Sequence, residues 1–164
     1  MDDSDTTKEA LLKSLDSARD HVLGILEGLD APALSKPVLP TNWNCIGMVH
    51  HLAIDVERFW FRQTVAGELV DDGADSTSAW KVSPDRPPQE VLALYRDEIE
   101  KANAIIAATP LDAEPKHWPE YFGSWRLPDL GAIVLHVITE TACHAGHLDA
   151  ARELLDGATW LVLG

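Results

Sequence analysis

The chain has 164 residues, of which 46% are hydrophobic and 24% are charged. This length and composition predict one globular domain over residues 1–164, with enough apolar surface for a substantial core. The 13 Lys and Arg against 27 Asp and Glu leave a formal charge of −14, which repels phosphate backbones and anionic lipid. We therefore expect no nucleic acid and no membrane surface among the partners.

The cellular location is predicted from what the sequence lacks. No run of about 18 apolar residues appears, and the first five residues are acidic where a secretory signal is basic and then apolar. The two cysteines, Cys45 and Cys143, are too few for a disulfide scaffold and are typical of a reducing compartment. We expect a cytoplasmic protein in which both cysteines are small, buried core residues.

Four stretches carry apolar residues at helical spacing, and none alternates convincingly with a period of two, so the pattern predicts an all-α fold. Ser4 or Asp5 is the expected N-cap of the first helix. In chain order, the expected helices run from about residue 6 to 29, from Asn42 or Asn44 to about 67, from Pro87–Pro88 to about 108, and from about 129 to 155.

Long connections separate the last three expected helices. The polar stretch from Asp71 to Pro88 is predicted to be a loop, and loops of this length in compact domains are more often functional than incidental. The next connection, from Leu111 to Pro128, holds four aromatic residues, and we expect it either to cover one end of the bundle or to form a hydrophobic plug. The sequence therefore predicts a four-helix bundle with long connections between helices 2 and 3 and between helices 3 and 4.

The last expected helix carries a strip of three polar residues. His136, Glu140 and His144 are four apart in sequence, so their side chains follow one face of the helix about a turn apart. Glu and His at this spacing also occur on many exposed helices as a solvated pair. Here the flanking residues are largely apolar, and a buried Glu or His without a partner is costly. A cation would satisfy several of these groups together.

The second expected helix adds histidines that can face this strip. His50 and His51 interrupt an apolar face, and Asp55 follows His51 by one turn. Imidazoles and carboxylates that converge from two helices are the usual way in which helical bundles build metal sites. Two His and one Glu leave a position open for water or substrate, and these ligand types suit zinc, nickel or iron.

Two segments resemble the DinB-like superfamily: WNCIGMVHHLA at residues 43–53 and ETACHAGHLDAARELLDG at residues 140–157. The resemblance spans nearly the whole chain, and within the superfamily it is to the actinobacterial branch, similar to the N-terminal domain of the mycothiol-dependent maleylpyruvate isomerases. It implies a DinB-like four-helix bundle whose second and fourth helices give a His and a Glu-x-x-x-His set to a metal, often zinc or nickel. The matching positions in this chain are His51, Glu140 and His144.

The remaining residues of these segments leave some choices open. Many DinB-like proteins have His where Glu140 stands, and the carboxylate form is the one that resembles the mycothiol-dependent branch. His50 is the register alternative to His51, but the family pattern places the ligand directly before Leu52. His147 is a fourth ligand, a pocket residue that transfers protons or binds substrate, or a surface residue, and we favour the pocket.

Two further polar positions carry expectations of their own. His136 is expected to be a core histidine hydrogen-bonded to a carbonyl. Asp149 and Arg152, three residues apart, are expected to pair with each other, although the family pattern repeats them and makes Arg152 a candidate to bind a substrate carboxylate.

The resemblance implies transfer or isomerisation with a low-molecular-weight thiol, and less commonly hydrolysis. A metal lowers the pKa of a thiol and makes it a nucleophile toward epoxides, haloalkanes or conjugated diones. We therefore expect a metal-dependent, mycothiol-type S-transferase or isomerase that acts on small electrophiles, with zinc as the first choice of metal. The alternatives are a non-enzymatic metal-binding or stress-response module and a metal-dependent hydrolase with His147 as general base. A homodimer is left open.

Overall fold

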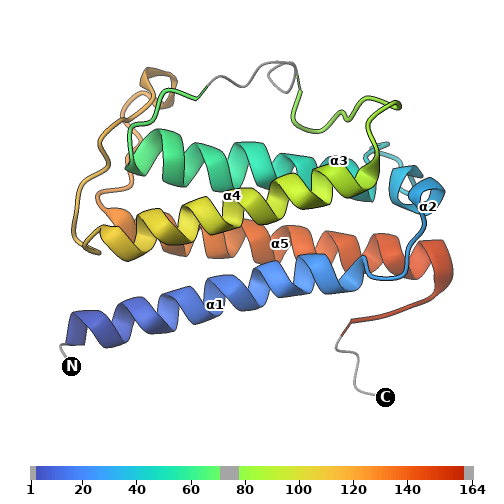
Figure 1. The fold of residues 1–164 in the computed structure, drawn as a ribbon, viewed down its shortest axis with the longest axis horizontal. Helices are drawn as coiled ribbons and strands as arrows, with labels where there is room; N and C mark the ends of the chain where they lie inside the picture. Colours follow the sequence, from blue (N-terminus) through green and yellow to red (C-terminus); the bar gives the residue numbers. More distant parts are fainter. Residues whose placement is uncertain (1–2, 71–77, 161–164) are drawn as a thin grey trace.

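The computed structural model describes residues 3–70 and 78–160, and within these ranges it contains helices and no strand. Four long helical stretches lie side by side along one axis (Figure 1), which confirms the expected all-α bundle. The four stretches are α1 (Asp3–Ile25), α3 (Cys45–His51) continued by η1 (Leu52–Val65), α4 (Pro88–Ala108) and α5 (Leu130–Asp156).

The direction of the helices explains one of the long connections. In Figure 1, α1 and α5 run one way and pack together, while η1 and α4 run the other way and also pack together. Two parallel neighbours need a connection that returns along the length of the bundle. Residues 66–70 begin this return and residues 78–87 complete it. The expected loop from Asp71 to Pro88 lies outside the described residues over 71–77.

Helix boundaries follow local capping chemistry. The Asn44 side chain accepts a hydrogen bond from Gly47 N at 2.8 Å where α3 begins, and the Asp129 side chain does the same for Ala132 N where α5 begins. Gly157, with a φ of 77°, ends α5 in the left-handed region that glycine adopts without strain. Asparagine and aspartate caps and a terminal glycine therefore set the limits of the two helices that carry the predicted ligands.

The structure departs from the expected helices in three places. The first helix already includes residues 4 and 5, so neither is its N-cap. A short helix, α2 (Ala31–Ser35), follows it, because Asp30 accepts a hydrogen bond from Ala33 N and Pro32 fits the first turn. From Leu52 to Val65 the backbone forms the wider i→i+5 hydrogen bonds of a π-helix, ending where Ala66 N donates to the Phe61 carbonyl at 2.9 Å.

Two buried carboxylates and their arginine partners fix η1 between its neighbours. Arg19 of α1 donates to both oxygens of Glu57 at 2.8 and 2.6 Å. On the other side, Arg58 and Arg62 each donate to Glu98 of α4 at 3.0 Å. Both carboxylates are fully or almost fully buried, so each needs its arginine partner to offset the cost of desolvation. The pairs set the position of η1 relative to α1 and α4.

The two cysteines have different environments. Cys45 is buried at the start of α3, as expected, whereas Cys143 is exposed on α5. The prediction for Cys143 was wrong because Ala142 and Cys143 lie on the outer face of a helix whose apolar residues extend around it. Over the described ranges, no helix is long and apolar enough to cross a membrane.

Candidate metal centre

The three predicted ligands come together between two helices. His51 ends α3, Glu140 and His144 lie one turn apart on α5, and one ligand atom of each lies within 4.8 Å of the others. The rings of His51 and His144 are 5.1 Å apart with their planes at 88°. About 13% of each of these imidazoles and 41% of the Glu140 side chain is exposed. The cluster is thus half-buried, with the carboxylate on its open side.

A second carboxylate orients His51. Asp55, one turn further along, lies with Oδ2 2.8 Å from His51 Nδ1. When Nδ1 carries the proton and donates it to Asp55, the lone pair of Nε2 is free to bind a metal. A carboxylate on the far nitrogen of a metal-binding histidine is a common arrangement, which fixes the tautomer and raises the basicity of the ring.

His144 is suited to metal binding by its surroundings. Burial, and then the nearby His51, lower the pKa of His144 below its usual value, while Glu140 opposes this shift. The imidazole is therefore neutral at pH 7, the form that binds metals. Its Nδ1 is buried and has no hydrogen-bond partner among the described residues, and its Nε2 is 3.5 Å from Glu140 Oε2, long for a hydrogen bond. An imidazole short of partners beside a carboxylate and a second imidazole fits a divalent ion.

Trp80 covers one side of the cluster. Its ring stacks on His51 with centroids 4.1 Å apart and planes at 17°. The segment that carries Trp80 approaches α3 closely, since a Cβ at Gly47 would lie 2.5 Å from the Trp80 carbonyl oxygen. His50 holds the same segment, because its Nδ1 lies 2.6 Å from the Ala79 carbonyl oxygen. His50 thus faces the connection, and His51 faces the cluster.

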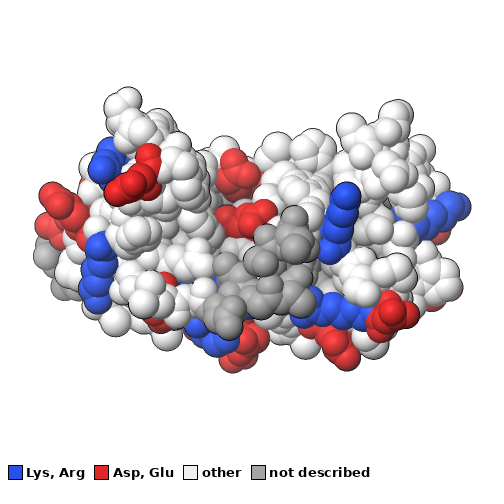
Figure 2. All heavy atoms as spheres, turned by 90° about the horizontal axis from the view of Figure 1, so that it is seen from above, with Lys and Arg blue, Asp and Glu red and all other residues white. Residues whose placement is uncertain are grey.

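A hollow of about 300 Å³ lies beside the cluster and shares His51 and Glu140 with it. Aromatic rings from η1, from α5 and from the connection between α4 and α5 form much of its wall. Its lining residues are His51, Asp55, Val56, Phe59, Trp60, Tyr121, Phe122, His136 and Glu140. Seen from above (Figure 2), acidic side chains gather near the middle of this face, between two lobes that project at the upper left and upper right of the view.

Comparison with known families decides the identity of this bundle. The family described as mycothiol S-transferase matches residues 10–157. The chain belongs to this family. The match confirms the predicted resemblance to the DinB-like superfamily and, within it, to the mycothiol-dependent branch. No curated protein and no solved structure matches the chain.

Two of the histidines singled out in the sequence lie at different places relative to the ligand cluster of this family member. His147 is exposed on α5, with its ring 5.7 Å from that of His144 and 6.4 Å from that of Trp43. His136 lies at the wall of the hollow, partly buried, with its ring edge-on to Trp60 at 4.8 Å. It therefore belongs to the pocket, where the sequence predicted a core residue.

The expected pair between Asp149 and Arg152 is wrong. Asp149 lies 2.8 Å from His21 Nε2 on α1, because α1 and α5 pack together along this face. Arg152 donates to Asp156 at 2.8 Å, to the carbonyl oxygen of Ile25 at the end of α1, and to that of Glu27 in the turn that follows. These contacts give Arg152 a structural role. They do not support its expected role in substrate binding, which stays a prediction.

Sequence reasoning missed Trp80 and the aromatic wall of the hollow in this family member. Trp80 stands in a polar stretch, where an isolated large aromatic residue is itself a signal of contact with something. The connection residues Tyr121 and Phe122 were expected to cover an end of the bundle, and the hollow beside the ligand cluster is where they lie. Periodicity could not show this, because it describes helices and not the course of connections.

Proposed function

We propose that this protein is a metal-dependent S-transferase that joins mycothiol, or a closely similar thiol, to small electrophiles. The observation that carries the proposal is the convergence of His51, Glu140 and His144 in a chain that belongs to the mycothiol S-transferase family. Zinc is the first choice of ion, since two imidazoles and a carboxylate with an open position form a common catalytic zinc set. Nickel or iron also fits these ligands.

A divalent ion held there supplies Lewis acidity, which lowers the pKa of a thiol near it. The residues of the chain do the rest. His51, Glu140 and His144 bind the ion, and Asp55 holds His51 in the required tautomer. Trp80 closes one side of the site to water, so the electrophile approaches from the side of the hollow.

The proposed transfer needs no reactant other than the thiol and the electrophile. With a haloalkane, the thiol sulfur forms a bond to carbon, the carbon–halogen bond breaks, and the halide leaves with the electron pair. The thiol proton passes to solvent. With an epoxide, the carbon–oxygen bond breaks instead, and the oxygen takes up a proton.

Elemental analysis of untagged protein, purified without added metal, tests the ligand set. We expect close to one divalent ion per chain in the wild type and in His147→Ala, the neighbouring exposed histidine. The double variant His51→Ala, His144→Ala should contain almost none. Equal and negligible metal in all three proteins would reduce Glu140 and His144 to a structural pair.

Thiol consumption tests the reaction. Mycothiol, glutathione and bacillithiol are each incubated with epoxides, haloalkanes and conjugated diones, before and after metal removal and reloading. We expect metal-dependent turnover, with mycothiol preferred. Full metal occupancy without turnover for any thiol would favour the alternative of a non-enzymatic metal-binding module.

A further inference from the structure

We infer that the hollow beside the ligand cluster selects the electrophile, and that it takes an uncharged molecule with an aromatic ring. The inference rests on the proposed function, since it names the class of second substrate for the same site. Four observations carry it: the position of the hollow, its walls, its charge and its size.

The position is settled by shared residues. His51 and Glu140, two of the three predicted ligands, also line the hollow. A group bound in the hollow therefore lies next to the ligand cluster, where a thiol held at that cluster can reach it. Trp80 stacks on His51 and is not among the described residues that line the hollow, so the approach from the hollow does not pass Trp80.

The walls are aromatic rings that pack against one another and present an aromatic surface to the hollow. Trp60 and Phe122 are stacked at 5.9 Å with planes at 11°. Phe59 lies edge-on to Trp60 at 5.0 Å, and His136 lies edge-on to it at 4.8 Å. Rings prefer these offset and edge-to-face contacts with other rings, each of which adds to the gain from apolar burial. The walls thus favour a flat aromatic guest.

The charge disfavours an anion. Among the described residues, the acidic and basic side chains of this lining other than histidine are two carboxylates, Asp55 and Glu140. A divalent ion at the cluster would add two positive charges that offset these carboxylates, and a thiolate beside the ion would leave one net negative charge, which repels an anionic guest. The adjoining larger hollow adds one further charge of each sign, Lys116 and Glu68, to the Asp55 that the two hollows share.

The volume of the hollow limits the ring system that the guest can place beside the ligand cluster. A cavity of roughly 150 Å³ holds a benzene molecule, and this hollow measures about 300 Å³. A substituted benzene or two fused rings therefore fits. The hollow continues into the larger one of about 650 Å³, with which it shares Asp55, Phe59 and Tyr121, so a substituent on the ring can extend there.

A binding experiment tests the inference whether or not the protein turns over. Two probes of one shape, neutral 4-fluorophenyl methyl sulfone and anionic 4-fluorobenzenesulfonate, are titrated against the metal-containing protein in the presence of mycothiol and followed by fluorine NMR. We expect the neutral probe to bind at least about tenfold more tightly, because one uncompensated negative charge at a partly solvated distance repels the anion by about this much. Phe122→Ala should weaken its binding severalfold, and Leu154→Ala, an exposed apolar residue elsewhere, should not. Equal binding of both probes, or no effect of Phe122→Ala, overturns the inference.

A kinetic experiment separates this inference from the proposed function. Replacing the ring fluorine of each probe by a bromomethyl group gives one neutral and one anionic electrophile. The thiol of mycothiol attacks the same bromomethyl carbon in both. We expect kcat/KM to favour the neutral compound, and Tyr121→Lys, at an exposed position on the rim, to raise kcat/KM for the anion relative to Tyr121→Gln. Turnover with no charge preference contradicts the inference alone. No turnover with either compound contradicts the proposed function, and the binding experiment then decides the inference.

Discussion

Asp55 shows how one residue outside the predicted ligand set can control the centre. It holds His51 through Nδ1 and is nearly half exposed. We expect Asp55→Asn to lower metal affinity by roughly tenfold, because the amide keeps a hydrogen bond but not the charge that raises the basicity of the ring. Competition with a chromophoric chelator measures the affinity. Asp85→Asn, an exposed residue on the connection, is the control, and equal affinities in all three proteins would contradict a role for Asp55.

His144 predicts a pH dependence for the metal-free protein. Its pKa is lower in the folded chain than the ordinary value of 6.5. Between these two pKa values the unfolded chain binds more protons, so the free energy of unfolding rises with pH. This contribution is fully present above pH 6.5 and is lost as the pH falls through the folded pKa. Urea unfolding from pH 5 to 8 should show that the free energy of unfolding rises less steeply with pH in His144→Gln than in wild type, whereas His117→Gln, at an exposed position, should leave this pH dependence unchanged.

The two cysteines should differ in reactivity. Burial raises the pKa of Cys45 to about 11, so its thiol is protonated at pH 8 and is shielded from reagents as well. Cys143 is exposed. Iodoacetamide at pH 8 should therefore label Cys143 alone in the native protein and both cysteines in urea, as read by mass spectrometry. Native labelling of Cys45 would show that the start of α3 opens.

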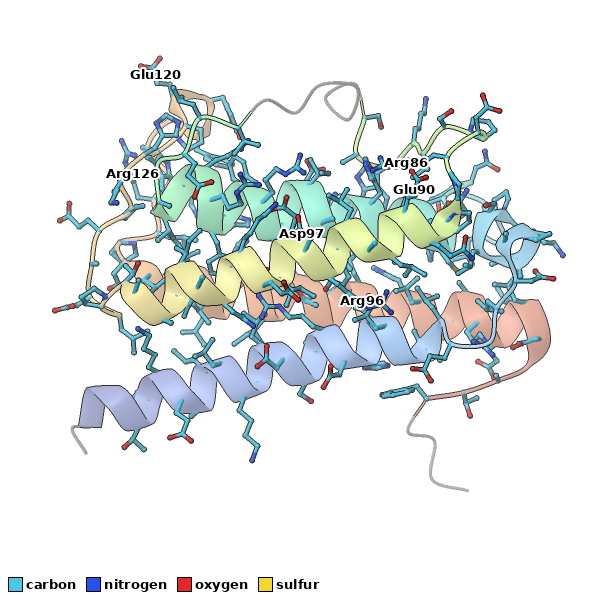
Figure 3. All side chains as sticks on the ribbon, viewed as in Figure 1. Arg86, Glu90, Arg96, Asp97, Glu120 and Arg126 are labelled. Carbon is cyan, nitrogen blue, oxygen red and sulfur yellow. The ribbon has the colours of Figure 1, made fainter. Side chains whose placement is uncertain are left out.

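Among the contacts between helices, we expect the buried ion pair between α1 and η1 to be the one whose loss lowers stability most. Arg19→Met leaves the Glu57 charge buried without its partner, and we expect a loss of about 3–5 kcal/mol in the free energy of unfolding. The double variant Arg19→Met, Glu57→Leu should recover much of this loss. Arg96→Met, on the exposed face of α4 (Figure 3), should change stability by less than about 0.5 kcal/mol. Chemical unfolding measures all three, and a single variant as stable as the double one would contradict the pairing.

The helices were largely predictable and their internal details were not. Helical periodicity with Asn44, Asp129 and Gly157 as end signals placed the second and last helices within a few residues. The π-helical hydrogen bonding of η1 and the pairing of Glu57 with Arg19 depend on which faces pack, and one chain's spacing does not contain that information. Charged residues on an apolar face look like exposed residues until a partner helix is known.

The same division holds for the site. The resemblance picked out His51, Glu140 and His144, and the structure brings their ligand atoms together. Trp80 and Phe122 escaped prediction because connections between helices set their positions. Sequence motifs identify the residues that carry out the reaction. The residues that form the walls of a pocket depend on the path of the connections between helices, which motifs do not describe.

For the whole molecule, metal binding should be coupled to stability, because the predicted ligands join α3 to α5. An ion present at 100 times its Kd adds about 2.7 kcal/mol to the folded state. For a chain of this length we expect a chelator to lower Tm by roughly 5–10 °C. The variant His51→Ala, His144→Ala should show the same Tm with and without chelator. An unchanged Tm in the wild type would contradict a site that binds metal in the folded protein.

The origin of the wall residues has a consequence for how such proteins diversify. The predicted metal ligands lie on long helices. Tyr121 and Phe122 belong instead to the short helix η3 (Glu120–Phe122) in the connection before α5. Figure 3 shows Glu120 of this helix at the outer edge of the molecule. Segments of this kind tolerate replacement better than packed helices do. Descendants of one ancestor could therefore acquire new electrophiles through changes in this segment alone, while inheriting the reaction intact.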